Sequence, residues 1–348
     1  MTIEKPNMKD VAKLANVSIG TVSKYINGDT KISPDNQSRI QQAIQKLNYT
    51  PNIIARKLAR GISDNLLLYI VHEYPVSTAT WLYVLPIIQG ISEYIKGSKY
   101  TMQIAMDPVE SMPKITDFII SGFHEKSISG VIIISPWRMD NKLLLKLANS
   151  SIPYSLIGVE NQLLHTNSVV MDNFGAIAML VEHLHGLGHQ SIAMINGLSG
   201  QYDMHERLRG FMDAVGRKQM TTCDEWITYG EQTMQDGFLR MKKIIESTGP
   251  KPTAVVCGND YIAAGVIKAI QDSGAFVPRD YSVTGFDDIT LSELLNPSLT
   301  TVRMPLFMLG TNGVKTVLNE IEKPGYHIAQ TVLPCEVLFK KSIGPPGI

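Results

Sequence analysis

A run of small, polar and basic side chains near the N-terminus could contact nucleic-acid bases. It spans residues 18–24 and reads Ser-Ile-Gly-Thr-Val-Ser-Lys. On a helix, Val22 would face inward, whereas Gly20, Thr21 and Lys24 would remain outside. Hydroxyl and ammonium groups can hydrogen-bond to base edges in a major groove. Recognition of DNA is therefore one chemistry that this run could perform.

Three short helices are predicted to position this run. Val11, Leu14 and Ala15 recur at helical spacing in a first helix at residues 8–15. A three-residue break then precedes a second helix at residues 19–26. A helix, a short break and a second short helix are typical of a helix-turn-helix, whose second helix enters a major groove. An ordinary three-helix bundle without a nucleic-acid role is the alternative, because short helix pairs are common.

Capping residues mark the helix boundaries. Ser18 can accept a backbone N–H bond at the start of the second helix. Ser33, Pro34 and Asp35 predict the start of a third helix: a cap, a proline at the first helical position and an acid near the positive helix end. Gly28 can take the left-handed conformation that ends the second helix.

Net charge is distributed unevenly along the chain. The 348 residues carry 32 basic and 32 acidic side chains. Ten basic and four acidic residues precede Ser63, a net charge of +6, so the remaining residues carry −6. A basic segment before an acidic body favours a polyanion-binding head, although many basic stretches are only solvated faces.

A second basic segment follows the three helices. In residues 53–60, Arg56, Lys57 and Arg60 surround Leu58. A helix of this length is marginal in water by itself. It could become ordered on a duplex, with its cations on phosphates and Leu58 inserted between base steps of the minor groove. A plain basic linker is the alternative.

The body of the chain reads as an α/β protein. Short apolar runs alternate with helical patterns after Leu66, as in parallel sheets covered by helices. Candidate strands are residues 66–71, 102–105, 130–134, 154–157, 192–195, 254–257, 282–285 and 299–302. Candidate helices are residues 84–95, 174–187, 206–215, 237–245 and 261–273. Ligands of open α/β sheets bind beyond the carboxyl ends of strands. Asn259 and Asp287 follow predicted strands, although Asn259 and Asp260 could also simply cap the next helix.

The sequence predicts no enzyme, no metal site and no cofactor. It contains no Gly-x-Ser-x-Gly or His-Glu-x-x-His motif and no phosphate-binding Gly-rich loop with lysine. His183, His185 and His189 are close in sequence, but the first two would point to different helix faces. We therefore expect no joint metal ligation by them.

Composition also suggests a compartment. The three cysteines are widely spaced and indicate neither a disulfide framework nor a metal cluster. The longest apolar runs are far short of the ~18 residues of a membrane span. The first ten residues are too charged for a signal peptide. We expect a cytoplasmic protein without a membrane partner.

Several motifs resemble the lactose-repressor/galactose-repressor (LacI/GalR) family of bacterial transcription regulators. In the head they read "MKDVAKLANVSIGTVSKYING", "SPDNQSRIQQAIQKLNYTPN" and "IARKLARG"; in the body they include "ERLRGF", "CGNDYIAAGVIKAI" and "VPRDYSVTGFDD". The resemblance implies an all-α N-terminal helix-turn-helix DNA-binding domain plus hinge helix, followed by a two-lobed α/β periplasmic-binding-protein-like effector domain. Its expected bounds are 7–51 for the DNA-binding domain, 52–63 for the hinge and 64–342 for the effector domain. Within the last, one lobe would comprise about 64–166 and 293–322, and the other about 167–292 and 323–342.

The resemblance also implies a set of DNA-binding residues. They are Ser18, Ile19, Gly20, Thr21, Ser23, Lys24, Asn27, Tyr49, Asn52, Lys57 and Leu58. Many members carry arginine where Lys24 stands, and arginine contacts guanine in two places at once. Lysine offers a point charge with looser geometry. We therefore expect an operator that differs from the best-known ones.

Effector contacts implied by the resemblance are Asp172, Asn259 and Asp287. Other positions depart from sugar-binding relatives: His205 stands where an arginine is expected, and Gly158 replaces an aspartate. Arg207 is retained, at a position that we assign to support of the fold. Trp81 and Tyr83 could stack on a sugar ring, although core packing is the commoner fate of aromatic residues. The expected effector is a small molecule, a carbohydrate or a derivative.

The predicted function is a repressor that binds a pseudo-palindromic operator as a homodimer and is controlled by this effector. One helix-turn-helix reads only a few base pairs, so two heads are needed for specificity. The residues after Phe339 contain no leucine heptad, which favours a dimer over a tetramer. Two alternatives remain: control by a partner protein instead of a small ligand, and a solute-binding protein. The basic head and the missing export signal count against the second.

Overall fold

The computed structural model describes residues 6–26, 31–49, 63–73, 75–159, 166–325 and 330–347. The chain divides into two units, Met1–Ser63 and Asp64–Ile348. The second unit contains two lobes, each built around a parallel sheet.

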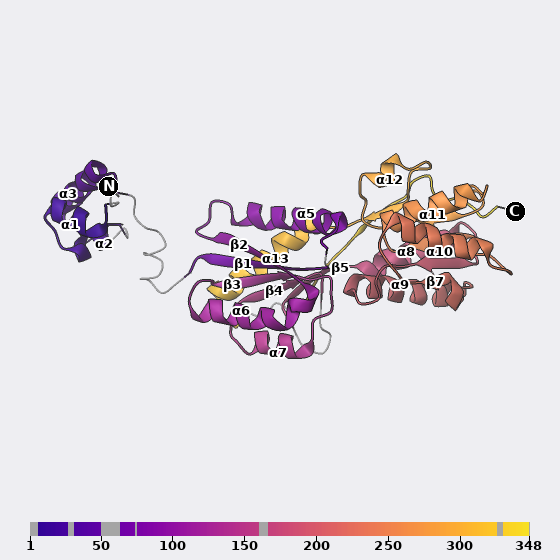
Figure 1. The fold of residues 1–348 in the computed structure, drawn as a ribbon, viewed down its shortest axis with the longest axis horizontal. Coiled ribbons are helices and arrows are strands. Elements are labelled where there is room, and N and C mark those ends of the chain that lie inside the picture. The colour runs from indigo at the N-terminus through magenta and orange to yellow at the C-terminus, as the bar shows by residue number, and fades with distance from the viewer. Residues whose placement is uncertain are drawn as a thin grey trace. The chain divides into compact units, whose positions relative to one another are not determined.

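The N-terminal unit contains α1 (Met8–Ala15), α2 (Ile19–Ile26) and α3 (Pro34–Leu47) (Figure 1). The predicted bounds of the first two helices are confirmed. Asn7 and Asp10 form a capping box at the start of α1. Asn16 ends the helix in the left-handed conformation, with φ 51°. This turn reverses the chain, so that α2 follows after only three residues.

One small core holds the three helices together. Its buried members are Val11, Ala12, Ala15, Val22, Ile40, Ala43 and Tyr49. Leu14, which was expected in this core, is instead 44% exposed. The side of α1 that faces the other helices is formed by residues 11, 12 and 15, and Leu14 lies beyond its edge.

The expected side-chain cap of α3 is also absent. Ser33 occupies the cap position, but its side chain makes no cap hydrogen bond. The backbone carbonyl of Ser33 accepts from the Gln37 N–H at 3.0 Å, and the Gln37 amide donates to the Ile32 carbonyl at 2.8 Å. Pro34 at the first helical position and the Gln37 side chain thus fix this helix start.

The first lobe has a six-stranded sheet in the order β11-β5-β4-β3-β1-β2, with every strand pair parallel. The strands are β1 (Asn65–His72), β2 (Thr101–Pro108), β3 (Gly130–Ile134), β4 (Tyr154–Ile157), β5 (Ser168–Met171) and β11 (Thr331–Leu333). The helices are α5 (Thr78–Ile95), η1 (Val109–Ser111), α6 (Met112–His124), α7 (Asn141–Ala148) and α13 (Leu306–Glu322).

Alternating residues of β1 pack into two different cores. Leu66, Leu68 and Ile70 pack with α5 and α13, whereas Leu67 and Tyr69 pack on the face covered by α6 and α7 (Figure 1). A strand that is buried on both faces reads as a continuous apolar run, which explains why the sequence predicted it well.

The second lobe has a four-stranded parallel sheet in the order β7-β6-β8-β9. Its strands are β6 (Ile192–Ile195), β7 (Ile227–Thr228), β8 (Ala254–Cys257) and β9 (Ser282–Thr284). Its helices are α8 (Asn173–Gly186), α9 (Tyr202–Lys218), η2 (Asp224–Trp226), α10 (Met234–Glu246), α11 (Asp260–Asp272) and α12 (Leu291–Leu294). One core lies between the sheet and α8 and α9, and another between the sheet and α10 and α11.

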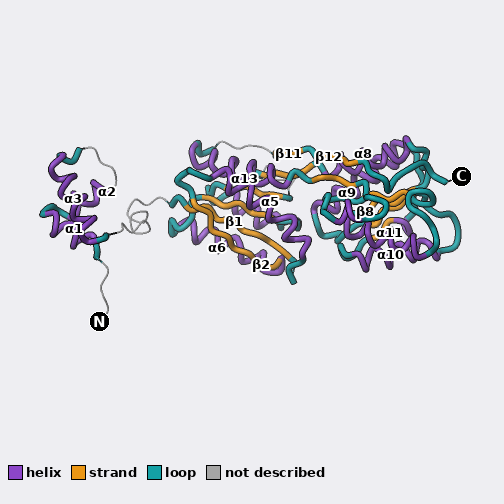
Figure 2. The backbone as a smooth tube through the Cα atoms, turned by 90° about the horizontal axis from the view of Figure 1, so that it is seen from above, coloured by secondary structure: helices purple, strands orange, loops and turns teal. Residues whose placement is uncertain are grey.

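Strand membership differs from the lobe boundaries expected from sequence. β5 and β11 pair in the first-lobe sheet, although their residues were expected in the second lobe. Thr300 bridges to Thr284 of β9, although residues 293–322 were expected in the first lobe. β10 (Thr301–Arg303) pairs antiparallel with β12 (Glu336–Leu338). Figure 2 shows β11 and β12 in succession along a segment that passes between the lobes.

Candidate functional site

The outer face of α2 carries the side chains expected to contact DNA. Val22 is fully buried and anchors the helix, whereas Ser18, Ile19 and Lys24 are exposed. Thr21 and Ser23 are partly exposed. A helix anchored along its apolar side can present its other side to a groove.

The start of α2 is held by side-chain hydrogen bonds. Ser18 Oγ accepts from the Thr21 backbone N–H at 3.1 Å, as the sequence predicted, and lies 2.8 Å from the Thr21 hydroxyl. A Cβ added to Gly20 would meet only Ser18 Oγ, at 3.6 Å. The helix backbone at Gly20 is therefore open to close approach.

Tyr49 serves the core of this unit. Its side chain is only 9% exposed and packs with the buried residues of the three helices. A phosphate contact by its hydroxyl stays a prediction. Four other predicted DNA contacts lie outside the described residues: Asn27, Asn52, Lys57 and Leu58.

In the second unit, the buried Arg207 contacts polar groups from several elements of the second lobe. Arg207 of α9 is 2% exposed. Its Nε donates to Asn173 Oδ1 at 2.9 Å, and its Nη1 donates to the Gly258 carbonyl. The guanidinium lies 3.5 Å from the centroid of the Phe286 ring. Such contacts hold the planar cation in one orientation.

Two carboxylates share this arginine. Asp287 Oδ1 lies 3.7 Å from Arg207 Nη1. Asp203, one helical turn before Arg207, accepts from Asn173 Nδ2 at 2.7 Å. Burial raises the pKa of Asp203 to about 6 and that of Asp287 to about 8, although Arg207 lowers both. We call Asn173, Asp203, Arg207 and Asp287 the polar cluster.

The backbone at Asp287 is unusual. Its φ is 110°, and that of Asp288 is 50°. Non-glycine residues rarely adopt such values, which persist where surrounding contacts impose them, often at functional sites. Asp287 and Asn259 follow β9 and β8, at the carboxyl ends where ligands of α/β sheets bind.

Two predicted effector residues cap helices. Asn259 Oδ1 accepts from the Ile262 N–H at 2.8 Å, so the capping interpretation is confirmed. Its Nδ2 still reaches Gln232 Oε1 at 3.4 Å. Asp172 caps α8 through the Gly175 N–H at 2.7 Å. Neither role excludes a ligand contact by the remaining lone pairs.

Tyr83 of α5 contacts the cores of both lobes. Its hydroxyl is buried without a hydrogen-bond partner among the described residues. Burial raises its pKa, and the charges of Asp203, Arg207 and Asp287 also act on it. A Cβ at Gly158, where φ is +82°, would lie 2.6 Å from this hydroxyl. Glycine at 158 therefore makes the room that Tyr83 occupies.

Trp81 and His205 are not members of the polar cluster. Trp81 is 39% exposed on α5. His205 Nδ1 lies 3.1 Å from Glu206 Oε1, and the pair lies beside the polar cluster on α9. The sequence interpretation did not single out Asp203, and it assigned Arg207 to support of the fold, which agrees with the burial and hydrogen bonds of this side chain. An acid four residues before an arginine in a helical segment was the available signal.

Comparisons with known proteins match both units. Residues 7–52 match bacterial regulatory proteins of the lacI family, and residues 181–343 match a periplasmic binding protein-like domain. The "Probable HTH-type transcriptional repressor ExuR" of Bacillus subtilis is 28% identical over 338 residues, which cover 97% of this chain and 98% of that protein. The chain belongs to the LacI family.

Solved structures of transcription regulators have the same fold. The lac repressor dimer bound to operator and the anti-inducer ONPF matches with a TM-score of 0.82 and 25% identity, over 97% of this chain and 99% of that one. The transcriptional regulator CelR in complex with cellobiose matches with a TM-score of 0.69 and 25% identity, over the same shares. This LacI-family chain is a DNA-binding transcriptional repressor and not an enzyme.

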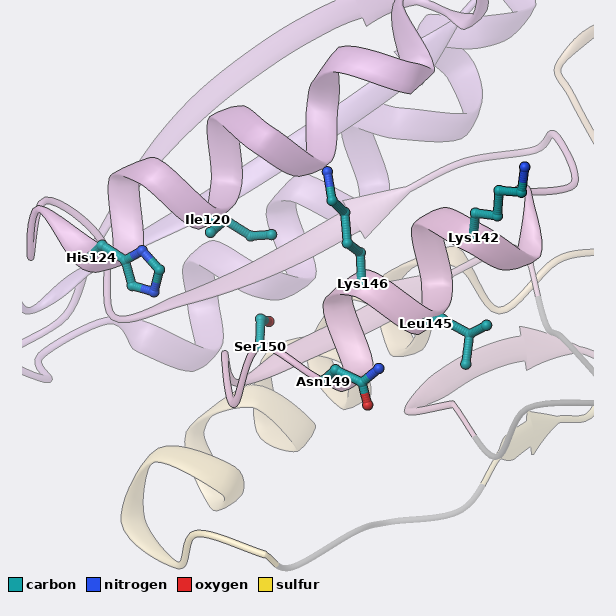
Figure 3. A pocket seen from close by; sticks show the side chains of 7 residues that line it. All are labelled: Ile120, His124, Lys142, Leu145, Lys146, Asn149 and Ser150. Carbon is teal, nitrogen blue, oxygen red and sulfur yellow. The ribbon is translucent and has the colours of Figure 1, made fainter.

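A shallow hollow lies elsewhere on this LacI-family chain. It has a volume of about 580 Å³ between α6 and α7, with Ile120 and His124 on one helix and Lys142 and Lys146 on the other (Figure 3). Lys146 is paired with Asp117 at 2.5 Å. The hollow is open and its polar groups are exposed, so it lacks the buried, convergent groups of the polar cluster.

Two kinds of structure are absent from the described residues. Within them, no helix combines the length and apolar character that crossing a membrane requires. No group of three or more His, Cys, Asp or Glu side chains in the described part of the chain could hold a metal ion.

Asp287→Asn should make the thermal stability of this LacI-family chain less dependent on pH. Asp287 binds its proton more tightly in the folded state, where its pKa is about 8, than in the unfolded state, where a pKa of about 4 is usual. Its contribution to stability is therefore complete at low pH and is lost as pH rises from about 4 to about 8. Melting temperatures between pH 6 and pH 8.5 should fall less steeply in the variant.

The matched control is Asp280→Asn, because the ion pair with Arg279 lowers the pKa of Asp280 below its usual range. That change should leave the fall above pH 6 as in the wild type. Equal slopes for wild type and Asp287→Asn would contradict the assignment of an acid with a raised pKa to this position.

Proposed function

We propose that the chain acts in the cytoplasm as a homodimer, binds a pseudo-palindromic operator and responds to a carbohydrate or carbohydrate derivative held at the polar cluster. The exposed outer face of α2 over the buried Val22 carries the DNA-binding part of this proposal. Two such helices, related by a two-fold axis, supply the specificity that one helix lacks. The solved relative that is bound to operator as a dimer supports this arrangement.

The polar cluster supports the effector part. Arg207, Asp203 and Asp287 supply charged donors and acceptors, and Asn173 and Asn259 add amides. Groups of this kind hydrogen-bond to the hydroxyls of a sugar. A solved relative in complex with cellobiose supports a carbohydrate.

Effector binding would act on DNA affinity through the lobes. A ligand at the polar cluster binds better to one arrangement of the lobes and increases its population. That arrangement sets the separation of the two residue 52–63 segments in the dimer and hence the operator affinity. Which arrangement the effector favours decides whether it induces or co-represses.

Thermal-shift screening of the full chain tests the effector. Neutral sugars, sugar phosphates and sugar acids are added at millimolar concentration. A ligand present at 100 times its dissociation constant stabilises the native state by about 2.7 kcal/mol, which shifts the melting temperature by several degrees. Control by a partner protein predicts that no compound in these classes shifts it.

Leu58→Ala should weaken operator binding without dissociating the dimer. The proposed role of Leu58 is insertion between base steps at the operator centre, where a bend allows more contacts with the protein. Truncation to alanine should cost about ten-fold in operator affinity, measured by fluorescence anisotropy. Sedimentation should still show a dimer. An operator titration that matches the wild type would contradict the hinge assignment.

A further inference from the structure

The two lobes touch where the loop after β3 meets the turn before α9. The Tyr202 backbone N–H donates to the Pro136 carbonyl at 2.8 Å. Trp137 and Gln201 form an antiparallel bridge. These are backbone contacts between the first lobe and the second, added to the segments that connect the lobes covalently.

Side chains reinforce this contact from both sides. Tyr202 starts a second-lobe helix, yet it is buried in a core cluster whose other buried members all belong to the first lobe. Trp137 packs against the same cluster. Its ring also lies against Gly200, because a Cβ added there would come within 3.1 Å of it. The absence of a side chain at position 200 is thus what lets the indole approach.

The contact is linked to Asn259 by hydrogen bonds and to the polar cluster through α9. Gln201 Oε1 accepts from Gln232 Nε2 at 2.6 Å, and Gln232 Oε1 accepts from Asn259 Nδ2 at 3.4 Å. Asp203 and Arg207 follow on the same helix, α9. A ligand that moves the start of α9 or Asn259 must therefore also strain the contact with the first lobe.

The Trp137 indole N–H favours opening of this contact. The Trp137 Nε1 atom is buried, with no hydrogen-bond partner among the described residues. A buried donor without a partner loses its bonds to water and gains none in return. Opening of the contact would return this N–H to water, which partly offsets the loss of packing.

We propose that Pro136, Trp137 and residues 200–202 form an interlobe latch, which holds the lobes together and transmits changes at the polar cluster to the first lobe. Two discrete arrangements of the lobes, latched and released, then differ in operator affinity. This last step rests on the proposed function, whereas the latch itself does not.

The test uses the full chain with two different changes to the latch. Trp137→Ala removes the ring. Gly200→Val places a branched side chain against it and keeps the proposal testable if the first variant does not fold. Gly216→Ala is the matched glycine control on α9, because a Cβ there meets nothing within 4 Å.

Hydrogen–deuterium exchange reports the latch directly. We expect peptides that contain residues 198–204 to exchange at least five-fold faster in both latch variants, because the Tyr202 N–H loses its protection. Exchange in the Gly216→Ala control should match the wild type. Wild-type exchange rates in every folded latch variant would overturn the proposal.

Operator titration then tests the coupling. With a duplex selected by the wild-type protein, affinity should change at least five-fold in the latch variants, in the range of typical allosteric couplings. Faster exchange with operator affinity within two-fold of the wild type would refute the transmission step. A wild-type protein without preference for any duplex would instead refute the proposed function, and exchange alone would then decide whether the latch exists.

Discussion

Arg207→Met should destabilise the second unit by about 3–5 kcal/mol, because removal of one partner from a buried ion pair leaves the other charge uncompensated. Arg207 is 2% exposed, and its loss leaves Asp287 and Asp203 in low dielectric surroundings without their cation. The pKa values of both acids should then rise further. Urea unfolding of the full chain, followed by circular dichroism, measures the change.

Arg209→Met is the matched control. Arg209 lies on the same helix, and its partner is Glu206, 2.7 Å away, but its side chain is 46% exposed. An exposed pair of this kind contributes at most about 1 kcal/mol. In the Arg207→Met background, Asp287→Asn should restore part of the lost stability, since it removes a carboxyl that must either take up a proton on folding or be charged without its cation. Equal destabilisation by the two arginine variants would show that Arg207 does not organise the cluster.

Lys24→Ala should reduce operator affinity by about 5- to 150-fold, the equivalent of about 1–3 kcal/mol for a good contact between a side chain and a base. Lys24 is exposed near the end of α2, the helix that we place in the major groove. The loss should be larger for the selected operator than for random DNA, because contacts with bases carry the sequence preference.

Lys46→Ala provides a control with the same change in net charge. Lys46 is exposed in the last turn of α3, outside the proposed reading helix. It should lower affinity by a smaller factor, and by the same factor for operator and random DNA. If both variants lose affinity without a change in sequence preference, Lys24 contacts phosphate and not a base.

Local signals explain why the N-terminal unit was predictable. The bounds of α1 and α2 follow from apolar spacing, from Ser18 as a cap and from the left-handed turn at Asn16. Leu14 was misplaced because helical spacing alone does not say how wide the buried face of a short helix is. That width depends on how closely α2 and α3 approach, which is a property of the tertiary packing.

Strands buried on both faces were predictable for a similar reason, whereas short edge and crossover strands were not. β3, β4, β6 and β8 have the predicted bounds. β11 has only three residues, one of them more than half exposed, and its partner β5 lies 160 residues away. Nothing in such a short segment indicates which sheet it joins, and this is why the strand membership of β5 and β11 differs from the expected lobe boundaries.

The candidate site was predictable only where it follows strands. Asn259 and Asp287 were found by their place after β8 and β9. Arg207 and Tyr83 depend on long-range packing: Arg207 on Gly258 and Phe286, and Tyr83 on the room left by Gly158. In the sequence, Gly158 indicates only that a carboxylate expected at this position is missing. In the structure it makes space for an aromatic side chain from another helix.

Selection of duplexes from a random pool by the full-length protein is the most direct test of the DNA-reading role assigned to α2. We predict that the enriched sequences are inverted repeats, and that the protein prefers them to scrambled duplexes at moderate salt. Lys24→Ala should shift the base preference within each half-site. An absence of preference for any inverted repeat, with and without candidate small molecules, would contradict the account.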